Sequence, residues 1–311
     1  VAQRAGYRER GAIAGRRAPS APPIDRTSPT GEAPSTASVR RTTRPGAVRS
    51  GRMPAPRKPG PRAHRPAQEQ KIPLVLRAGP EIEFRREKMP DVSRLVDRQD
   101  FHVLIPHLLR VGVLADAALP SLKQFTTLLL QWNRMASNLI SQSDESRVVS
   151  RHLVESLAPA HWLKDAAKAR WVDFGSGGGF PAIPLSLVGV GTSWTLVESR
   201  RTKTLFLRRV AQELKLPNIS IATSRLEDFV LEDQNRGAYD GFTSRATLTL
   251  GPTLMLAADL VVPGGEAFLW KGSRFVVEAS EEQSWQENWE HTGLLGVGEG
   301  HTRVARFKRR G

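Results

Sequence analysis

The order of apolar and polar residues divides the chain into a helical region and a later region of alternating strands and helices. Leu122, Phe125, Leu129 and Trp132 recur at spacings of three and four, which is typical of one buried helix face. After Trp171, short apolar runs alternate with helical patterns. The predicted strands are 171–174, 194–198, 219–223, 239–244, 266–270 and 302–307. This alternation predicts an α/β fold with a doubly wound, mostly parallel sheet.

Three regions follow from the change of pattern along the chain. We expect a disordered basic leader rich in Arg and Pro at 1–90, a helical cap at 91–165 and the sheet domain at 166–311. Within the sheet domain, residues 201–216 read as one amphipathic helix. Its apolar face carries Phe206, Val210 and Leu214.

Charge is concentrated in the leader. Residues 1–90 hold 20 of the 46 basic and 7 of the 31 acidic residues, which leaves 26 basic and 24 acidic residues, a net charge of +2, for the remainder. With few large apolar side chains, the leader cannot offset its ordering entropy. It is interpreted either as a basic arm for RNA or as an incidental leader or transit peptide, and the incidental leader is favoured.

Composition excludes several classes of protein. The chain has no cysteine, and therefore no disulfide, no thiolate metal ligand and no cysteine nucleophile. The longest apolar stretch, 248–262, is interrupted by Gly251, Pro252 and Asp259, so no membrane span is predicted. We expect a cytoplasmic monomer without metal or membrane partners.

The stretch WVDFGSGGGFPAIPLSL, residues 171–187, reads as a strand, a glycine-rich turn and a helix, an arrangement that lets a ligand touch bare backbone. A dinucleotide fingerprint requires glycine where Phe180 stands, and a P-loop requires lysine and a hydroxyl residue where Phe180 and Pro181 stand. The pattern D-x-G-x-G-x-G from Asp173 to Gly179 resembles the first motif of class I S-adenosylmethionine-dependent methyltransferases.

Acidic residues follow the next two predicted strands. Glu198 is placed to accept hydrogen bonds from ribose hydroxyls, which would also suit a nicotinamide enzyme. Leu226 and Glu227 follow the third strand, where they could meet an adenine. Glu227 could equally be an ordinary acid in the first turn of a helix.

Seven stretches in order resemble the small-subunit ribosomal RNA methyltransferase G family, also called glucose-inhibited division protein B. They are QWNRMASNLIS, RHLVESL, VDFGSGGGFPAIPLSL, VESRRTKTLFLRRV, SRLEDF, SRATLTL and WKG, and the resemblance covers about 97–308. It implies a class I, Rossmann-like methyltransferase fold with an N-terminal helical extension, and methyl transfer from S-adenosylmethionine to N7 of guanine 527 in 16S rRNA. The cofactor-binding residues expected are Gly175, Phe180, Leu226, Glu227 and Arg245, together with Ser176, Gly177 and Glu198.

The chain departs from the family pattern at three positions. Ile140 stands where threonine is usual, Glu155 where aspartate is common, and Ala182 where glycine usually follows Phe-Pro. Ile140 lacks a hydroxyl that could have touched RNA or a neighbouring helix.

The chemistry of the target agrees with the resemblance. Guanine N7 has a lone pair and no proton, so its methylation needs positioning more than a general base. Enzymes that methylate exocyclic amines carry [DN]-P-P-[FYW] after the fourth strand, where this chain has SRATLTL, and pyrimidine C5 methylation usually needs a cysteine.

Roles for individual side chains stay open. Arg245 is the candidate for catalysis, and Arg151, His152 and Lys271 are candidates for contacts with 16S rRNA or the small ribosomal subunit. Trp132 is expected in the core, while Trp270 could stack on a base or pack. Two other functions are possible: a class I methyltransferase acting on another RNA, a protein or a small molecule, and a non-enzymatic RNA-binding factor for ribosome assembly.

Overall fold

The structure, a computed structural model, describes residues 89–135, 138–165, 169–245, 248–281, 283–298 and 300–311. The leader prediction falls on residues 1–88, outside the described residues, and only its last two positions are described. Among the described residues, no helix is both long and apolar enough to cross a membrane.

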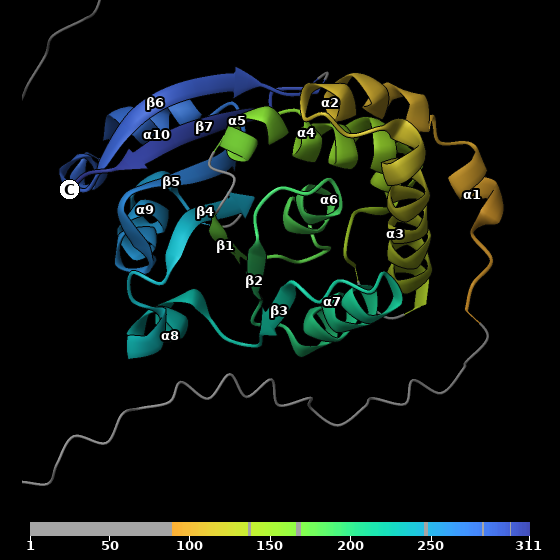
Figure 1. Ribbon diagram of the computed structural model, residues 1–311, viewed down its shortest axis with the longest axis horizontal. Coiled ribbons are helices and arrows are strands. Elements are labelled where there is room, and N and C mark those ends of the chain that lie inside the picture. Colours follow the sequence, from red (N-terminus) through yellow and green to blue (C-terminus); the bar gives the residue numbers. More distant parts are fainter. Residues whose placement is uncertain (1–88, 136–137, 166–168, 246–247, 282, 299) are drawn as a thin grey trace, which may run out of the picture. The chain divides into compact units, whose positions relative to one another are not determined.

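A seven-stranded sheet of order β3-β2-β1-β4-β5-β7-β6 organises the described chain (Figure 1). The strands from β3 to β5 pair in parallel, and β7 is antiparallel to both of its neighbours. The predicted α/β, mostly parallel sheet is confirmed. The strands are β1 (Arg170–Phe174), β2 (Ser193–Val197), β3 (Ile219–Ala222), β4 (Tyr239–Arg245), β5 (Val261–Lys271), β6 (Trp289–Gly296) and β7 (Arg303–Arg309).

Helices cover both faces of this sheet. α6 and α7 share one hydrophobic cluster with inward-facing residues of β1, β2 and β5, whereas α8, α9 and α10 share a second cluster with the opposite face. Figure 1 shows the two groups on either side of the strands. These elements are α6 (Ala182–Leu187), α7 (Arg201–Glu213), α8 (Leu226–Leu231), η4 (Asp233–Asn235), α9 (Leu250–Leu260), α10 (Phe275–Glu281) and η5 (Ser284–Glu287).

The helices before β1 extend the first cluster. Its long helix α3 contacts α6 and α7, and Leu122, Phe125, Leu129 and Trp132 are all buried, which confirms the predicted apolar stripe. The Trp132 ring lies 5.8 Å from the ring of Phe206 in α7. The elements of the cap are α1 (Ser93–Asp97), η1 (Phe101–Leu104), α2 (Ile105–Arg110), α3 (Ala115–Met135), η2 (Gln142–Arg147), the π-helix η3 (Val148–Leu153), α4 (Val154–Leu157) and α5 (Ala160–Asp165).

One strand, β6, was not predicted from the sequence. β6 lies at the edge of the sheet, beyond β7, and among its residues only Trp289 is buried. A strand with one neighbour and one buried side chain carries little apolar alternation, so its sequence resembles a loop. The apolar stretch 248–262 supplies α9 and the start of β5.

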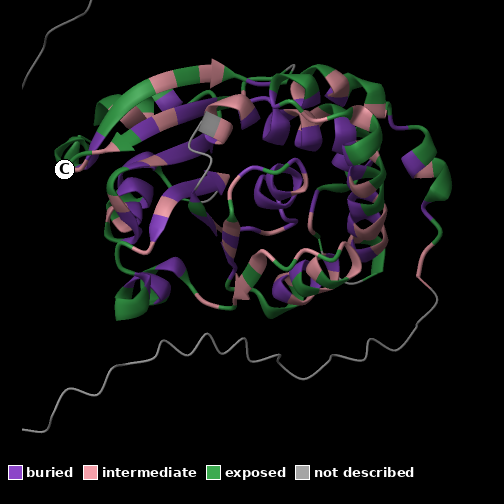
Figure 2. Ribbon diagram, viewed as in Figure 1, coloured by how far each residue is buried: buried purple, intermediate pink, exposed green. Residues whose placement is uncertain are grey.

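Trp171 fills the centre of the first cluster. The centre of its ring lies 5.4 Å from that of Trp194, on which it stacks, and 5.8 Å from that of Phe268. Figure 2 shows many buried residues along the strands of the sheet. Gly241 on the neighbouring strand leaves the space for this ring, because a Cβ there would lie 2.3 Å from Trp171 Cζ3. Trp171 and Gly241 are paired in register, so the large and small residues are matched across β1 and β4.

We predict that Gly241→Ala lowers the free energy of unfolding by about 1–3 kcal/mol, because a methyl group must displace a packed tryptophan ring. Gly296→Ala is the matched control, since a Cβ at this strand glycine meets nothing within 4 Å. Urea unfolding of the two variants measures the difference. Equal stability would show that the packing at Trp171 relaxes without cost.

Candidate active site

The glycine turn, Gly175–Gly179, joins β1 to the segment that enters α6. Gly175, Gly177 and Gly179 have φ angles of +69°, +50° and +86°, a region that strongly favours glycine. At Gly179 a Cβ would also lie 2.7 Å from Ile183 Cγ1, so both conformation and space require glycine there. The Gly175 amide donates to Val197 O at 2.9 Å, which fixes the turn against the end of β2.

Glu198 lies directly after β2 and faces the glycine turn. Its Oε2 accepts a hydrogen bond from the Gly177 amide at 3.0 Å, and its Oε1 accepts one from the Arg200 amide at 2.8 Å. Although Glu198 is buried, each oxygen keeps lone-pair capacity for another donor. The sequence therefore identified an acid that the fold places at the turn.

Leu226 and Glu227 begin α8, after the third strand. Leu226 is fully buried in the second cluster, which also contains Val172 and Val197 from the sheet. Glu227 is exposed. These two residues follow the same edge of the sheet as Glu198, but no described contact joins them to the glycine turn.

Arg245 ends β4 and reaches into the cap. It donates to Nδ1 of His152 at 3.0 Å and to the Glu155 carboxylate, and its guanidinium lies 5.8 Å from the centre of the Phe180 ring. The side chain is only 13% exposed. Burial lowers the pKa of Arg245, and the nearby Glu155 opposes that shift, so the group stays cationic.

His152 stacks on Phe180, with ring centres 5.1 Å apart and planes 26° apart. Burial, followed by the charge of Arg245, lowers the pKa of His152 to about 3. The ring is therefore neutral near pH 7. Because Nδ1 accepts from Arg245, we assign the proton to Nε2, which lies 3.6 Å from Oδ2 of Asp144.

Glu155 connects the cap, β4 and the C-terminal strands. One carboxylate oxygen faces Arg245, and the other accepts a hydrogen bond from the Thr302 hydroxyl at 3.0 Å. The backbone oxygen of Glu155 accepts from Nε1 of Trp270 at 2.7 Å. Three segments far apart in the sequence therefore meet at this residue.

Arg151 forms the outer edge of the same cluster. Its Nη1 donates to Oδ1 of Asp144 at 2.6 Å, and its Nε lies 3.9 Å from the Glu155 carboxylate. Burial raises the pKa of Asp144, but hydrogen bonds from Ser141 and Arg151 outweigh it and hold that pKa below the usual range. Asp144 is thus ionised beside a cation.

Two candidates for contacts with a ligand have partners inside the protein. Lys271 donates to the Leu248 backbone oxygen at 2.8 Å and to Glu278 at 2.9 Å, and its side chain is 11% exposed. Trp270 is buried and bound to the Glu155 backbone, so it packs instead of offering a stacking face. Neither role was decided by the sequence.

Asp173 lies buried at the end of β1, below the glycine turn. Its Oδ1 accepts from the Thr243 hydroxyl at 2.6 Å, and its Oδ2 has no hydrogen-bond partner among the described residues. Burial raises the pKa of Asp173 to about 7. Ser176 donates to the Asp173 backbone oxygen at 3.0 Å, which holds the turn over this carboxyl group.

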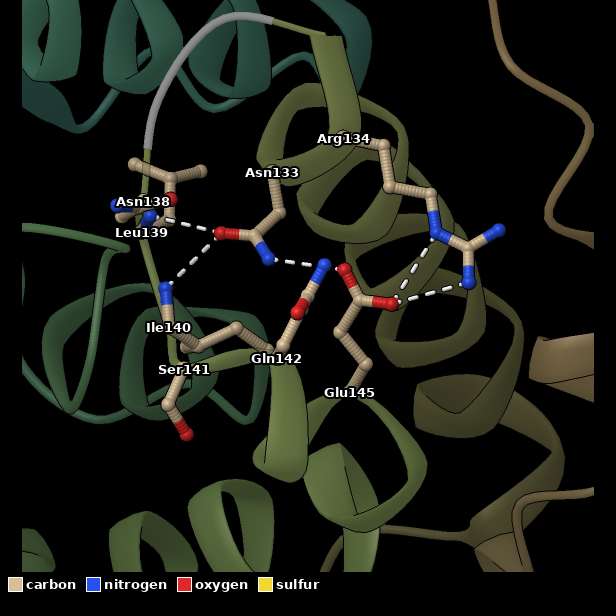
Figure 3. Close-up of a pocket in the computed structure, with 8 residues that line it drawn as sticks. All are labelled: Asn133, Arg134, Asn138, Leu139, Ile140, Ser141, Gln142 and Glu145. Atoms are coloured by element: carbon tan, nitrogen blue, oxygen red, sulfur yellow. Dashed lines mark hydrogen bonds and ion pairs between the residues drawn. The ribbon is translucent and has the colours of Figure 1, made fainter.

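A polar cavity of about 710 Å³ lies within the cap, lined by residues between Asn133 and Glu145 (Figure 3). The Asn133 side-chain oxygen accepts from the Leu139 and Ile140 amides, and its nitrogen donates to Glu145, which also pairs with Arg134. A Cβ on Gly178 would lie 3.5 Å from Leu139 O, so this segment contacts the turn. Ile140 is buried in the core.

Sequence reasoning missed the connecting carboxylates. Glu155 was noted only as a departure and Asp173 only as the first residue of the glycine motif, and Asp144 and Thr302 had no predicted role. An acid one helical turn from Arg151 was the available signal for Glu155. For Thr302, more than a hundred residues further on, the sequence gives no such signal.

The cluster is suited to position a reactant more than to remove a proton. Its carboxylates are paired with cations, and a histidine whose pKa is about 3 is a weak base. No group of three or more metal-ligand side chains occurs among the described residues.

Comparisons with known proteins show that the chain is similar to methyltransferases of ribosomal RNA. A family model described as rRNA small subunit methyltransferase G (GidB) matches residues 118–293. The ribosomal RNA small subunit methyltransferase G of Stutzerimonas stutzeri is 40% identical over 40% of this chain, which spans 56% of that relative. The one from Wolinella succinogenes is 35% identical over 55% of this chain and 83% of the relative. The solved putative methyltransferase yhhF from Escherichia coli is 18% identical, with a TM-score of 0.41 over 50% of this chain and 86% of that chain.

We predict that Arg245 and Glu155 depend on each other for stability. Arg245→Gln or Glu155→Gln removes one partner of a buried ion pair and should cost roughly 3 kcal/mol, near the lower end of the usual range because Thr302 and Arg151 also face Glu155. The double variant should cost less than the sum by about 0.5–3 kcal/mol. Urea unfolding of all four proteins measures this coupling, and strict additivity would contradict it.

We predict that ionisation of the buried Asp173 carboxyl group lowers the free energy of unfolding as pH rises. Its folded pKa, about 7, lies above the ordinary carboxyl value. The folded state therefore binds more protons between about pH 4 and pH 7, and the free energy of unfolding falls as pH rises through this range. The free energy of unfolding of Asp173→Asn, measured relative to wild type, should increase by roughly 2–3 kcal/mol between about pH 5 and pH 7.5. A difference between the two proteins that does not change with pH would contradict the prediction.

Proposed function

The chain belongs to the rRNA small subunit methyltransferase G family, and we propose that it transfers a methyl group from S-adenosylmethionine to N7 of guanine 527 in 16S rRNA. The fold is that of a class I S-adenosylmethionine-dependent methyltransferase, with a Rossmann-like sheet and a helical extension before it. One observation carries the proposal for the reaction: Arg245, His152 and Phe180 meet beside the glycine turn without a strong base among them.

Features of this chain fit S-adenosylmethionine. The glycine turn offers backbone in conformations that other residues rarely adopt, and Glu198 brings a carboxylate to it. Below the turn, Oδ2 of Asp173 is a buried polar atom without a described partner, as expected where a ligand completes the hydrogen bonding. We propose that the cofactor is held by Gly175, Phe180, Leu226, Glu227 and Arg245, with Ser176, Gly177 and Glu198.

Methyl transfer to guanine N7 requires the protein mainly to orient the two reactants. When bound, S-adenosylmethionine supplies an electrophilic methyl group on a sulfonium. Attack by the N7 lone pair on this methyl group would form the new carbon–nitrogen bond as the methyl–sulfur bond broke, and would leave the positive charge on the guanine ring. No proton moves, so a well-oriented approach can supply roughly 7–11 kcal/mol without a general base. Arg245, fixed by Glu155 and His152, is proposed to hold the cofactor carboxylate or an RNA phosphate.

The proposed partner is 16S rRNA or the small ribosomal subunit, with the protein acting as a cytoplasmic monomer without a metal. Among the three RNA candidates, Arg151 is the best placed, because its side chain is 39% exposed. His152 and Lys271 are held by Arg245 and Glu278 within the protein.

The product in RNA tests this proposal. Purified protein, labelled S-adenosylmethionine and hypomethylated 16S rRNA or small subunits should give one 7-methylguanosine at position 527, located by borohydride and aniline cleavage. Gly175→Asp is the control for cofactor binding, because a charged side chain at φ +69° strains and fills the turn and should abolish transfer. Methylation of another nucleotide, or of protein alone, would refute the proposed target, and cofactor binding without any transfer would favour an assembly factor.

A further inference from the structure

A second, smaller pocket of about 260 Å³ lies above Glu155, between the cap and the loop that joins β6 to β7. We call it the hairpin pocket. Its lining residues are Arg147, Ser150, Arg151, Glu155, Gly300, His301 and Thr302. It is distinct from the larger cavity of Figure 3, whose Arg134 and Asn133 already pair with Glu145.

The described lining is suited to an anion. Arg147 and Arg151 stand one helical turn apart, with side chains 57% and 39% exposed, and both face the single carboxylate of Asp144, at 4.0 and 2.6 Å. One carboxylate cannot occupy the donors of two guanidinium groups, since each carries five. Ser150 adds a hydroxyl group and His301 adds an exposed ring, whereas the Thr302 hydroxyl already donates to Glu155.

The acid at the floor of the pocket is already compensated. Glu155 is 4% exposed, and its carboxylate faces Arg245 on one oxygen and accepts from Thr302 on the other. Its charge is therefore shared between Arg245 on the interior side and Thr302 and Arg151 at the pocket. Among the described lining residues, the cationic groups with exposed side chains are Arg147 and Arg151, and guanidinium groups bind phosphate with good geometry.

Size and location favour part of a long molecule over a whole small one. Pockets for small ligands usually measure about 300–1,000 Å³, so this one suits a single phosphate with its neighbouring sugar. The floor residue Glu155 also holds Arg245 beside Phe180. A strand seated here would pass directly over the cluster where the methyl transfer is proposed.

We infer that the hairpin pocket binds a backbone phosphate of the substrate RNA next to the target nucleotide, with Arg147 on the cap and His301 on the β6–β7 loop as its two walls. This inference rests on the proposed function and extends it, because it makes the C-terminal hairpin part of the RNA-binding surface. The hairpin contributes two residues. Thr302 is hydrogen-bonded to Glu155, and His301 is exposed, where an RNA strand could approach it.

Binding of a 16S rRNA transcript to the full-length double variant Arg147→Gln/His301→Ala tests the inference. Affinity at about 150 mM salt should fall roughly three- to tenfold, and the slope of log affinity against log salt should decrease by about 0.7–0.9 for each phosphate that the variant no longer neutralises. In the methylation assay, KM for RNA should rise more than kcat falls, as expected when substrate binding alone is weakened.

Arg236→Gln is the matched control for charge. Arg236 is exposed and lies before the first residue of β4, whereas Arg245 is the last residue of that strand. Replacing Arg236 should therefore leave the affinity and the salt slope unchanged. Melting temperature and cofactor affinity of every variant show whether the fold is intact. His301→Ala alone, an exposed change on a loop, provides a second test should the double variant unfold.

The outcomes separate this inference from the proposed function. Equal RNA affinity and salt slope for the pocket variants and Arg236→Gln would overturn the pocket assignment while methylation by wild type stands. Absence of methylation by wild type would overturn the proposed function, and the binding measurements would still decide whether the hairpin pocket holds RNA.

Discussion

The buried ion pair between Arg245 and Glu155 is the interaction on which the candidate site depends. It joins the end of β4 to the cap, and both side chains are nearly excluded from solvent. Desolvating two charges is costly, so such a pair persists only where geometry and further hydrogen bonds compensate it. His152 supplies one on the arginine side and Thr302 one on the carboxylate side.

The length of the Glu155 side chain explains how three segments meet there. The carboxylate reaches Arg245 and Thr302 at once, and Gly298 leaves room for it, because a Cβ at that glycine would lie 3.3 Å from Glu155 Cγ. Gly298 also has a φ angle of +67°, which favours glycine for its own reason. The Glu155 side chain is therefore accommodated by the loop that also lines the hairpin pocket.

The fixed orientation of Arg245 and the low basicity of His152 belong together in this site. The same burial that holds Arg245 over Phe180 lowers the pKa of His152 to about 3, so the ring acts as a neutral acceptor and stacking partner. A reaction that transfers no proton is not slowed by the low basicity of His152. The proposed attack of guanine N7 is such a reaction.

Local pattern determined much of this protein: the parallel strands, the stripe on α3, the glycine turn and the acid after β2 could be predicted because each depends on residues near in sequence. The edge strand β6, with one buried residue, left no such pattern. Only the tertiary structure decided that Lys271 pairs with Glu278, that Trp270 packs on the Glu155 backbone, and that Arg245 meets Glu155 ninety positions earlier. The reason is physical: a polar side chain takes whichever partner the packed fold brings within reach, and spacing along the chain carries no information about contacts made across it.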